Sequence, residues 1–250
     1  MRHRASLGAA IAALFLLPGI VGAADITLLA GGATKDVIEQ LLPAFEKSTG
    51  HKVVATWSPA PLIRKRLAAG EVYDLVISTA PEIDAFIEQG KLAPGSRTGL
   101  MKTGVGVAVR AGAARPDIGS ADALRSALLA AKSVGHSSGT SGEYVVSMIA
   151  RLGIADQLKP KLRQAPPSVR VATLLASGEV ELGIQQASEI MHEPGIDYLG
   201  PLPPELQKIT LYAAGLPTAA RQPEAAKALV KALSGPDAEA AIRKQGMEPG

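Results

Sequence analysis

The sequence predicts an α/β protein with two lobes, each a mainly parallel sheet flanked by helices, joined by two crossover strands. Apolar strand-like runs alternate with amphipathic stretches along the chain, a pattern typical of βα units. The alternation pauses at a Gly-rich apolar run over 105–109, restarts near Ser120, and ends before another apolar run over 209–213. We therefore expect lobe 1 to comprise residues 25–104 and 214–250. Lobe 2 is expected over 105–213, between hinge strands near 103–110 and 208–215.

The first part of the chain contains three strand–helix steps, which favour a parallel sheet. Strands are predicted over 26–30, 52–57 and 73–77, and the glycine pair Gly31-Gly32 follows the first of them. The first helix shows apolar residues at helical spacing and ends at Gly50, a candidate for a left-handed cap. The second helix runs to Gly70, and Thr79 is the expected N-cap of the third.

The same rhythm continues in the second part of the chain. We expect helices over 121–131, 141–152 and 169–176, and strands around 133–134, over 180–184 and over 209–213. Two Ala-rich helices that begin at Pro223 and Pro236 complete the chain, because proline suits the first turn of a helix.

Residues 1–24 have the pattern of a cleavable signal peptide. Arg2 and Arg4 precede an apolar run over 9–21, and small residues lead up to Asp25. The apolar run is too short to cross a bilayer comfortably. We expect cleavage near Ala23 or Ala24 and a periplasmic, monomeric mature protein.

Composition excludes several classes of function. Cysteine is absent, which rules out disulfides, thiolate catalysis and cysteine-based metal sites. Without Arg2 and Arg4 the chain has 24 basic and 23 acidic residues and no basic cluster, so we expect no binding to nucleic acid. His51, His136 and His192 lie far from one another in the sequence, and we predict neither a metal nor a cofactor.

The turn after the first strand is the first candidate for anion binding. Gly32, Ala33 and Thr34 precede a helix start, where backbone N–H groups favour negative charge. Thr34 also suits a helix cap, and Lys35 suits either ligand contact or an exposed first turn.

The segment 135–144 is the richest ligand-loop candidate, because it gathers glycines and hydroxyls before a helix. Its candidate contacts are Ser137, Ser138, Thr140 and Ser141. Thr140 and Glu143 also have the spacing of a capping box, and His136 suits either a ligand contact or solvent. The segment matches the G-x-S-x-G pattern of serine hydrolases, but the short strand and delayed helix argue against that chemistry.

Two further positions lie at strand ends. Gln185 and Gln186 follow the strand over 180–184, where open α/β sheets place ligands. Trp57 ends the second strand and is expected to contribute to both the core and the cleft wall.

Several segments resemble the type II periplasmic substrate-binding proteins, in particular the molybdate-binding proteins of ABC transporters and their divergent relatives. The segments that show this resemblance are 42–50, 70–78, 199–203 and 244–249. The resemblance implies a small anionic ligand held between the lobes, contacts that include Ser78, and an inner-membrane ABC permease as partner. It also implies ligand hydroxyls at Ala33 and at Ala60 or Pro61, where this chain has none; Thr34 and Ser58 are nearby substitutes. This departure disfavours molybdate, and Lys35, Arg64 and Arg66 favour a carboxylate.

Two functions follow from the resemblance. The first is a periplasmic receptor that captures a carboxylate or oxyanion, closes by hinge motion and delivers it for uptake. The alternative is an exported isomerase that interconverts cis- and trans-aconitate, as divergent relatives do. Its candidate acid–base and clamp residues are Lys35, Arg64, His136, Glu143 and Tyr144.

Overall fold

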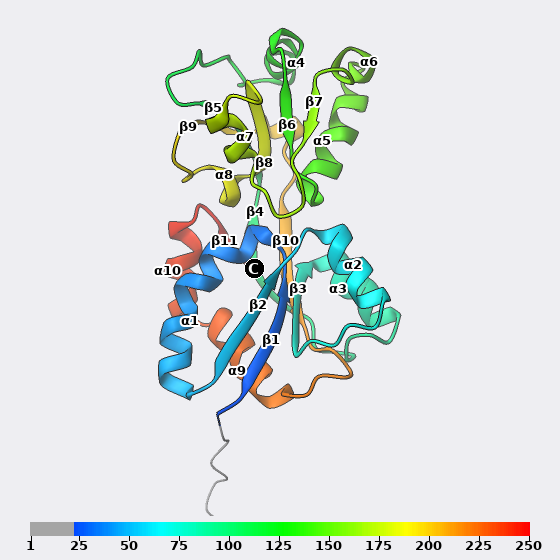
Figure 1. Ribbon diagram of the computed structural model, residues 1–250, viewed down its shortest axis with the longest axis vertical. Coiled ribbons are helices and arrows are strands. Elements are labelled where there is room, and N and C mark those ends of the chain that lie inside the picture. The colour runs from blue at the N-terminus through cyan, green and yellow to red at the C-terminus, as the bar shows by residue number, and fades with distance from the viewer. Residues whose placement is uncertain (1–22) are drawn as a thin grey trace, which may run out of the picture.

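The computed structural model describes residues 23–250, which form two lobes stacked along the long axis of the molecule (Figure 1). The predicted signal peptide lies outside the described residues, apart from Ala23 and Ala24. No helix in the described part of the chain is long and apolar enough to cross a membrane.

The first lobe, which we call lobe 1, contains a six-stranded sheet of order β11-β4-β10-β3-β1-β2. Its elements are β1 (Asp25–Ala30), η1 (Gly32–Thr34), α1 (Lys35–Thr49), β2 (Lys52–Trp57), α2 (Ala60–Ala68), β3 (Leu75–Thr79), α3 (Ala80–Glu88), β4 (Thr98–Thr103), β10 (Thr210–Gly215), α9 (Pro223–Leu233), α10 (Pro236–Lys244) and β11 (Glu248–Pro249).

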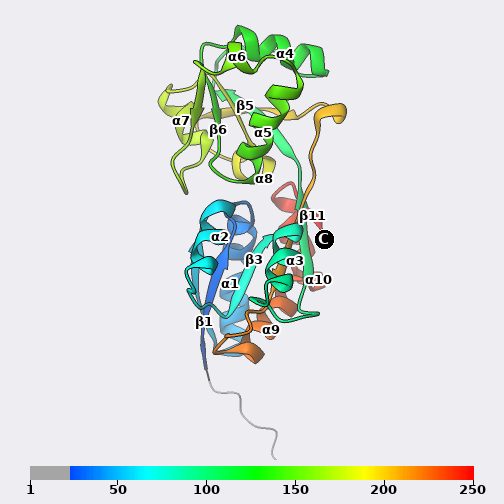
Figure 2. The same ribbon diagram turned by 90° about the vertical axis from the view of Figure 1, so that its right-hand side faces the viewer.

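The second lobe, lobe 2, contains a five-stranded sheet of order β7-β6-β8-β5-β9. Its elements are β5 (Val105–Arg110), α4 (Ala121–Ala130), β6 (Val134–His136), α5 (Thr140–Arg151), α6 (Ala155–Leu158), β7 (Leu162–Gln164), α7 (Val171–Ser177), β8 (Leu182–Gln186), α8 (Ala187–Ile190), β9 (Ile196–Pro201) and η2 (Pro204–Leu206). Two segments join the lobes, the β4–β5 link and the link from β9 through η2 to β10 (Figure 2).

Both sheets are mixed, which corrects the prediction of mainly parallel sheets. Strand β1 pairs in parallel with β2 and β3, but β10 pairs antiparallel with β3 and β4. In lobe 2, β6 is parallel to β7 and β8, whereas β5 is antiparallel to β8 and β9. The connecting strands β4, β5, β9 and β10 account for the antiparallel pairs, since each lobe is entered and left through them.

Helices cover both faces of each sheet, and alternating residues of one strand serve opposite faces. Ile26 and Leu28 of β1 pack with α1, α9 and α10, whereas Leu29 packs with α2 and α3. The predicted helix cap at Gly50 is confirmed, because this residue has a left-handed φ of 76° and ends α1. The predicted helix starts at Pro223 and Pro236 are also confirmed.

Candidate functional site

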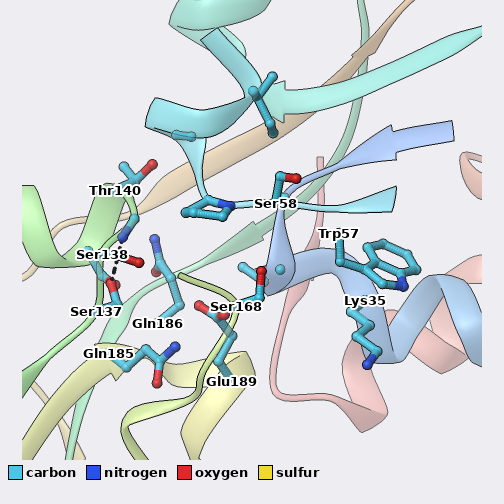
Figure 3. A pocket seen from close by; sticks show the side chains of 18 of the residues that line it. Lys35, Trp57, Ser58, Ser137, Ser138, Thr140, Ser168, Gln185, Gln186 and Glu189 are labelled. Atoms are coloured by element: carbon cyan, nitrogen blue, oxygen red, sulfur yellow. Dashed lines mark hydrogen bonds between the residues drawn. The ribbon is translucent and has the colours of Figure 1, made fainter. Parts of the chain in front are cut away.

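A pocket of about 310 Å³ lies between the lobes and is lined from both sides (Figure 3). This volume is at the lower end of the roughly 300–1,000 Å³ range usual for small-molecule sites. Lobe 1 supplies Gly31, Gly32, Ala33, Lys35, Trp57, Ser58, Pro59, Ala60, Ile63, Ser78, Thr79 and Tyr212. Lobe 2 supplies Ser137, Ser138, Gly139, Thr140, Ser141, Ser168, Val169, Arg170, Gln185, Gln186 and Glu189.

The pocket lies where helical segments begin. Its lining includes the N-cap residues of η1, α2, α3, α5, α7 and α8, which are Gly31, Pro59, Thr79, Gly139, Arg170 and Gln186. None of these N-cap side chains accepts a hydrogen bond from its own helix. Backbone N–H groups at helix starts carry partial positive charge, so the arrangement favours an anionic ligand.

The loop between β6 and α5 is organised by Ser137. Its Oγ accepts hydrogen bonds from the N–H groups of Gly139, at 3.2 Å, and Gly142, at 3.1 Å. With both lone pairs used, the Ser137 hydroxyl donates to Ser141 Oγ at 2.9 Å, which leaves the Ser141 proton for another acceptor. A Cβ at Gly142 would lie 1.7 Å from the Ser137 carbonyl oxygen, so only glycine fits there.

Two neighbouring glutamines at the end of β8 have different partners. Gln185 Oε1 accepts from the backbone N–H of Val171 at 2.7 Å, which caps the first turn of α7. Gln186 Nε2 donates to Thr210 Oγ1 at 3.1 Å. Gln186 Oε1 is buried and has no hydrogen-bond partner among the described residues. The position of both glutamines at this strand end agrees with the predicted ligand edge of the sheet.

Arg170 is the main cation of the pocket wall. It donates to Asp36 Oδ1 of lobe 1 at 2.7 Å and to Glu193 Oε1 of lobe 2. Burial opposes the charged form, but the two carboxylates outweigh this effect and raise the pKa of Arg170 above its usual value. The guanidinium is therefore fixed at the lobe boundary, with part of its side chain bordering the cavity.

Among the described residues, Glu189 is the only carboxylate that lines the pocket. It is half-buried, and it lies in the short helix α8 that follows β8. Burial raises its pKa to about 7, against the opposing influence of the Arg170 charge and a hydrogen bond from Gln185. A carboxyl group with this pKa exchanges protons near neutral pH.

Most of the predicted ligand residues border the pocket. The structure places ten of them in its lining, namely Gly32, Ala33, Lys35, Ser58, Ser78, Ser137, Ser138, Thr140, Ser141 and Gln185. Two of these residues, Ser78 and Lys35, already interact with other side chains of the protein. The Ser78 hydroxyl donates to Glu82, and the Lys35 ammonium points away from the glutamines in Figure 3 and lies 3.9 Å from Glu39 Oε1.

Three predicted residues lie outside the lining, and each has a polar atom in contact with a backbone carbonyl oxygen. Thr34 is fully buried, and its hydroxyl donates to the carbonyl oxygen of Gly31 at 2.9 Å. His136 is buried under the loop, with Nδ1 3.1 Å from the Ser137 carbonyl oxygen, and burial lowers its pKa. The Tyr144 hydroxyl donates to the Leu206 carbonyl oxygen at 2.6 Å, beside the segment that leads to β10.

Arg64 and Glu143 also lie outside the lining, because they bind each other across the lobe boundary. Arg64 Nη2 is 2.9 Å from Glu143 Oε1, and Arg64 also pairs with Glu82. The predicted capping box is wrong, since Thr140 is the first residue of α5 and Gly139 is its N-cap. Arg66 pairs with Glu71 at 2.8 Å instead of facing the pocket.

Sequence reasoning missed Ser168, Arg170 and Glu189. Arg170 precedes a seven-residue helix, and Glu189 lies in a four-residue helix, and neither has a distinctive motif. One signal could have identified Glu189. Ligands bind at the carboxyl ends of the strands in open α/β sheets, and this rule, which selected Gln185, also applies to the short helix α8 that directly follows the strand.

The described residues give little support for a metal site or for a nucleophilic serine. Residues 23–250 contain no group of three or more His, Asp or Glu side chains that could hold a metal ion. The hydrogen bonds of Ser137 Oγ go to two backbone N–H groups and Ser141, and none to a histidine nitrogen. The serine is thus engaged in shaping the loop.

The chain is similar to one curated enzyme over its whole length and to molybdate-binding proteins over most of it. It is 34% identical over 250 residues to an aconitate isomerase of Pseudomonas sp, covering 98% of this chain and 95% of that protein. It is 22% identical to the molybdate-binding protein ModA of Escherichia coli (strain K12), covering 88% of each chain. These findings confirm the resemblance described from the sequence.

A solved structure supports the two-lobed fold. The periplasmic molybdate-binding protein of Azotobacter vinelandii matches with a TM-score of 0.74 and 20% identity, covering 89% of this chain and 98% of that chain. The family model described as "Bacterial extracellular solute-binding protein" matches residues 26–248. With nearly all of the described chain inside this match, the protein belongs to the bacterial extracellular solute-binding family.

Proposed function

We propose that the protein binds aconitate, a small tricarboxylate, in the interlobe pocket and interconverts its cis and trans isomers by moving a proton. The observation that carries the proposal is the character of the pocket wall. The helices α2, α3 and α5 begin there, and Arg170 adds a permanent cation with several N–H donors. Such a wall is suited to a planar carboxylate.

Two further facts favour a carboxylate over a metal oxyanion. Ala33 and Ala60 line the pocket at the positions where the resemblance to molybdate-binding proteins implies hydroxyls, and Thr34 gives its hydroxyl to the backbone. The full-length identity of 34% to an aconitate isomerase also exceeds the 22% to ModA. Both facts support an organic ligand.

The experiment is incubation of the purified protein with trans-aconitate, followed by proton NMR. We expect cis-aconitate to accumulate until the same isomer ratio is reached from either starting isomer. Heat-denatured protein is the control. Binding of aconitate without interconversion would contradict the isomerase and leave the binding function standing.

A second candidate is a receptor that delivers the anion to an inner-membrane ABC permease. The specific observation in its favour is that two ion pairs, Arg170–Asp36 and Arg64–Glu143, bridge the lobes, and side-chain contacts of this kind can break and re-form when a protein opens and closes on its ligand. A thermal-shift screen of aconitate, citrate, molybdate and sulfate tests binding. No shift with any of them would remove both candidates.

A further inference from the structure

We propose that Glu189 is the catalytic residue that removes the proton from the bound tricarboxylate and returns it, an inference that rests on the proposed isomerase function. The side chain projects from α8 and lines the pocket (Figure 3). It faces the first turn after β1, because a Cβ built on Gly32 would lie 2.9 Å from Glu189 Oε1. The carboxyl group thus spans from lobe 2 to the wall of lobe 1.

The other titratable groups of the lining are poorly suited to act as a base. Arg170 stays protonated, since its pKa is raised further by Asp36 and Glu193. Burial raises the pKa of Tyr212, so its phenol keeps its proton at neutral pH. Lys35 is paired with Glu39 and extends away from the glutamines. Glu189 is the remaining proton acceptor in the lining.

Charged groups around Glu189 come from every side of the pocket. Arg170 favours the carboxylate, whereas Asp36 and Glu193 favour the protonated acid. Tyr212 from β10 stays neutral, and burial dominates the balance, which leaves the Glu189 pKa at about 7. Near neutral pH the carboxyl group is therefore part carboxylate and part acid, as a group that both takes and returns a proton must be.

The chemical step is balanced without any co-reactant. The Glu189 carboxylate takes a proton from the methylene carbon of aconitate, and the electron pair of that C–H bond delocalises over the three-carbon allylic unit and its carboxylates. The protonated Glu189 then returns a proton to the other end of that unit, which moves the double bond and permits either geometry. Helix-start N–H groups and Arg170 stabilise the added negative charge in the transition state.

The glycine at position 32 leaves room for the Glu189 carboxyl group, because a Cβ there would make the end of the Glu189 side chain shift. The 2.9 Å approach is shorter than a normal contact to a Cβ atom. The glycine that the sequence pattern identifies as part of a turn therefore also makes room for the proton acceptor.

The test compares Glu189→Gln with the matched control Glu224→Gln, which lies on the exposed surface of α9. We expect Glu189→Gln to lower the isomerisation rate by about 10²–10⁴-fold, the usual contribution of a general base, while aconitate still raises the melting temperature. In deuterium oxide the wild type and the control should incorporate deuterium into aconitate, and Glu189→Gln should not. The wild-type kcat/KM should rise with pH through an apparent pKa of about 7.

The outcomes separate the two proposals. A wild type that binds aconitate but never interconverts it overturns the proposed function and this inference with it. A wild type that interconverts aconitate, alongside a Glu189→Gln variant active within about tenfold, overturns only the role of Glu189, since loss of a general base costs more than that. If Glu189→Gln fails to fold or bind, Glu189→Asp decides: a reduced rate with a displaced pH profile supports the role, and an unchanged rate and profile overturn it.

Discussion

Two arginines bridge the lobes with the same kind of partners, yet only one of them borders the pocket. Arg64 belongs to lobe 1 and binds Glu82 of its own lobe and Glu143 of lobe 2. Arg170 belongs to lobe 2 and binds Glu193 of its own lobe and Asp36 of lobe 1. We call these the Arg64 cluster and the Arg170 cluster.

The two clusters differ in exposure and in what lies next to them. The Arg64 side chain is 45% exposed and lies outside the pocket lining, whereas that of Arg170 is 21% exposed and borders the cavity beside Glu189. Exposed ion pairs contribute little because water and salt screen them, and shielded ones act strongly on nearby charges. Composition and charge alone therefore do not indicate which of the two arginines borders the pocket.

The largest expected effect is the loss of ligand affinity when Arg170 is replaced. Arg170→Gln should weaken aconitate binding by at least about 30-fold, or about 2 kcal/mol, because a shielded charge that faces an anion is removed. Arg64→Gln should change it by no more than about fivefold, or about 1 kcal/mol. Isothermal titration of both variants checks the comparison, and a larger effect at Arg64 would reverse our assignment.

A smaller effect is expected from the carboxylate that each arginine binds across the lobe boundary. Asp36→Asn should move the pH–rate profile to lower pH, because Asp36 raises the pKa of Glu189. Glu143→Gln should leave the profile in place, since this residue lies outside the lining and 53% of its side chain is exposed. Rates measured between pH 5 and 9 test both variants, and equal profiles would show that the clusters are equivalent.

The free energy of unfolding should also depend on pH, because Glu189, on the Arg170 side of the pocket, changes its protonation near neutral pH. Glu189 has a folded-state pKa of about 7, above its ordinary value of 4.5. Between these values the folded protein holds a proton that the unfolded chain has released, so stability from this group is full below about pH 4.5 and is lost as the pH rises through 7. Urea unfolding of the wild type and Glu189→Gln at several pH values measures this; a slope that persists in the variant must come from other groups.

The smallest effect is expected from salt. The modest change caused by Arg64→Gln should vanish at about 1 M salt, where the screening length falls to about 3 Å. The effect of Arg170→Gln on binding should persist in part, because the Arg170 side chain is only 21% exposed. Repeating the titrations at low and high salt provides the measurement, and complete loss of both effects would mean that both clusters act as exposed pairs.

Local sequence signals predicted much of lobe 1. The glycine turn, the helix with apolar residues at helical spacing and its end at Gly50 are all present as expected. Signals at element boundaries were less reliable: Thr79 is the N-cap of α3, but its side chain forms no capping hydrogen bond. Short elements such as α6 and α8 had no pattern long enough to be recognised.

The candidate site was predicted where it depends on loops at strand ends and missed where it depends on distant pairs. Gly32 and the segment that includes Ser137 and Ser141 combine glycines and hydroxyls at helix starts, which is a local property. Arg170 and its partner Asp36 are 134 residues apart, and no periodicity links them.

By itself, the sequence determined the alternation of strands and helices, the two-lobed fold and the two glycine- and hydroxyl-containing loops that border the pocket. These features follow from hydrophobic period, glycine and proline placement and helix-start chemistry, all of which act over a few residues. Only the tertiary structure decided that Arg170 and Glu189 belong to the pocket and that Arg64, His136 and Tyr144 do not. The reason is physical: a side chain's neighbours, and so its burial and proton affinity, are set by chain segments that meet only in the folded protein.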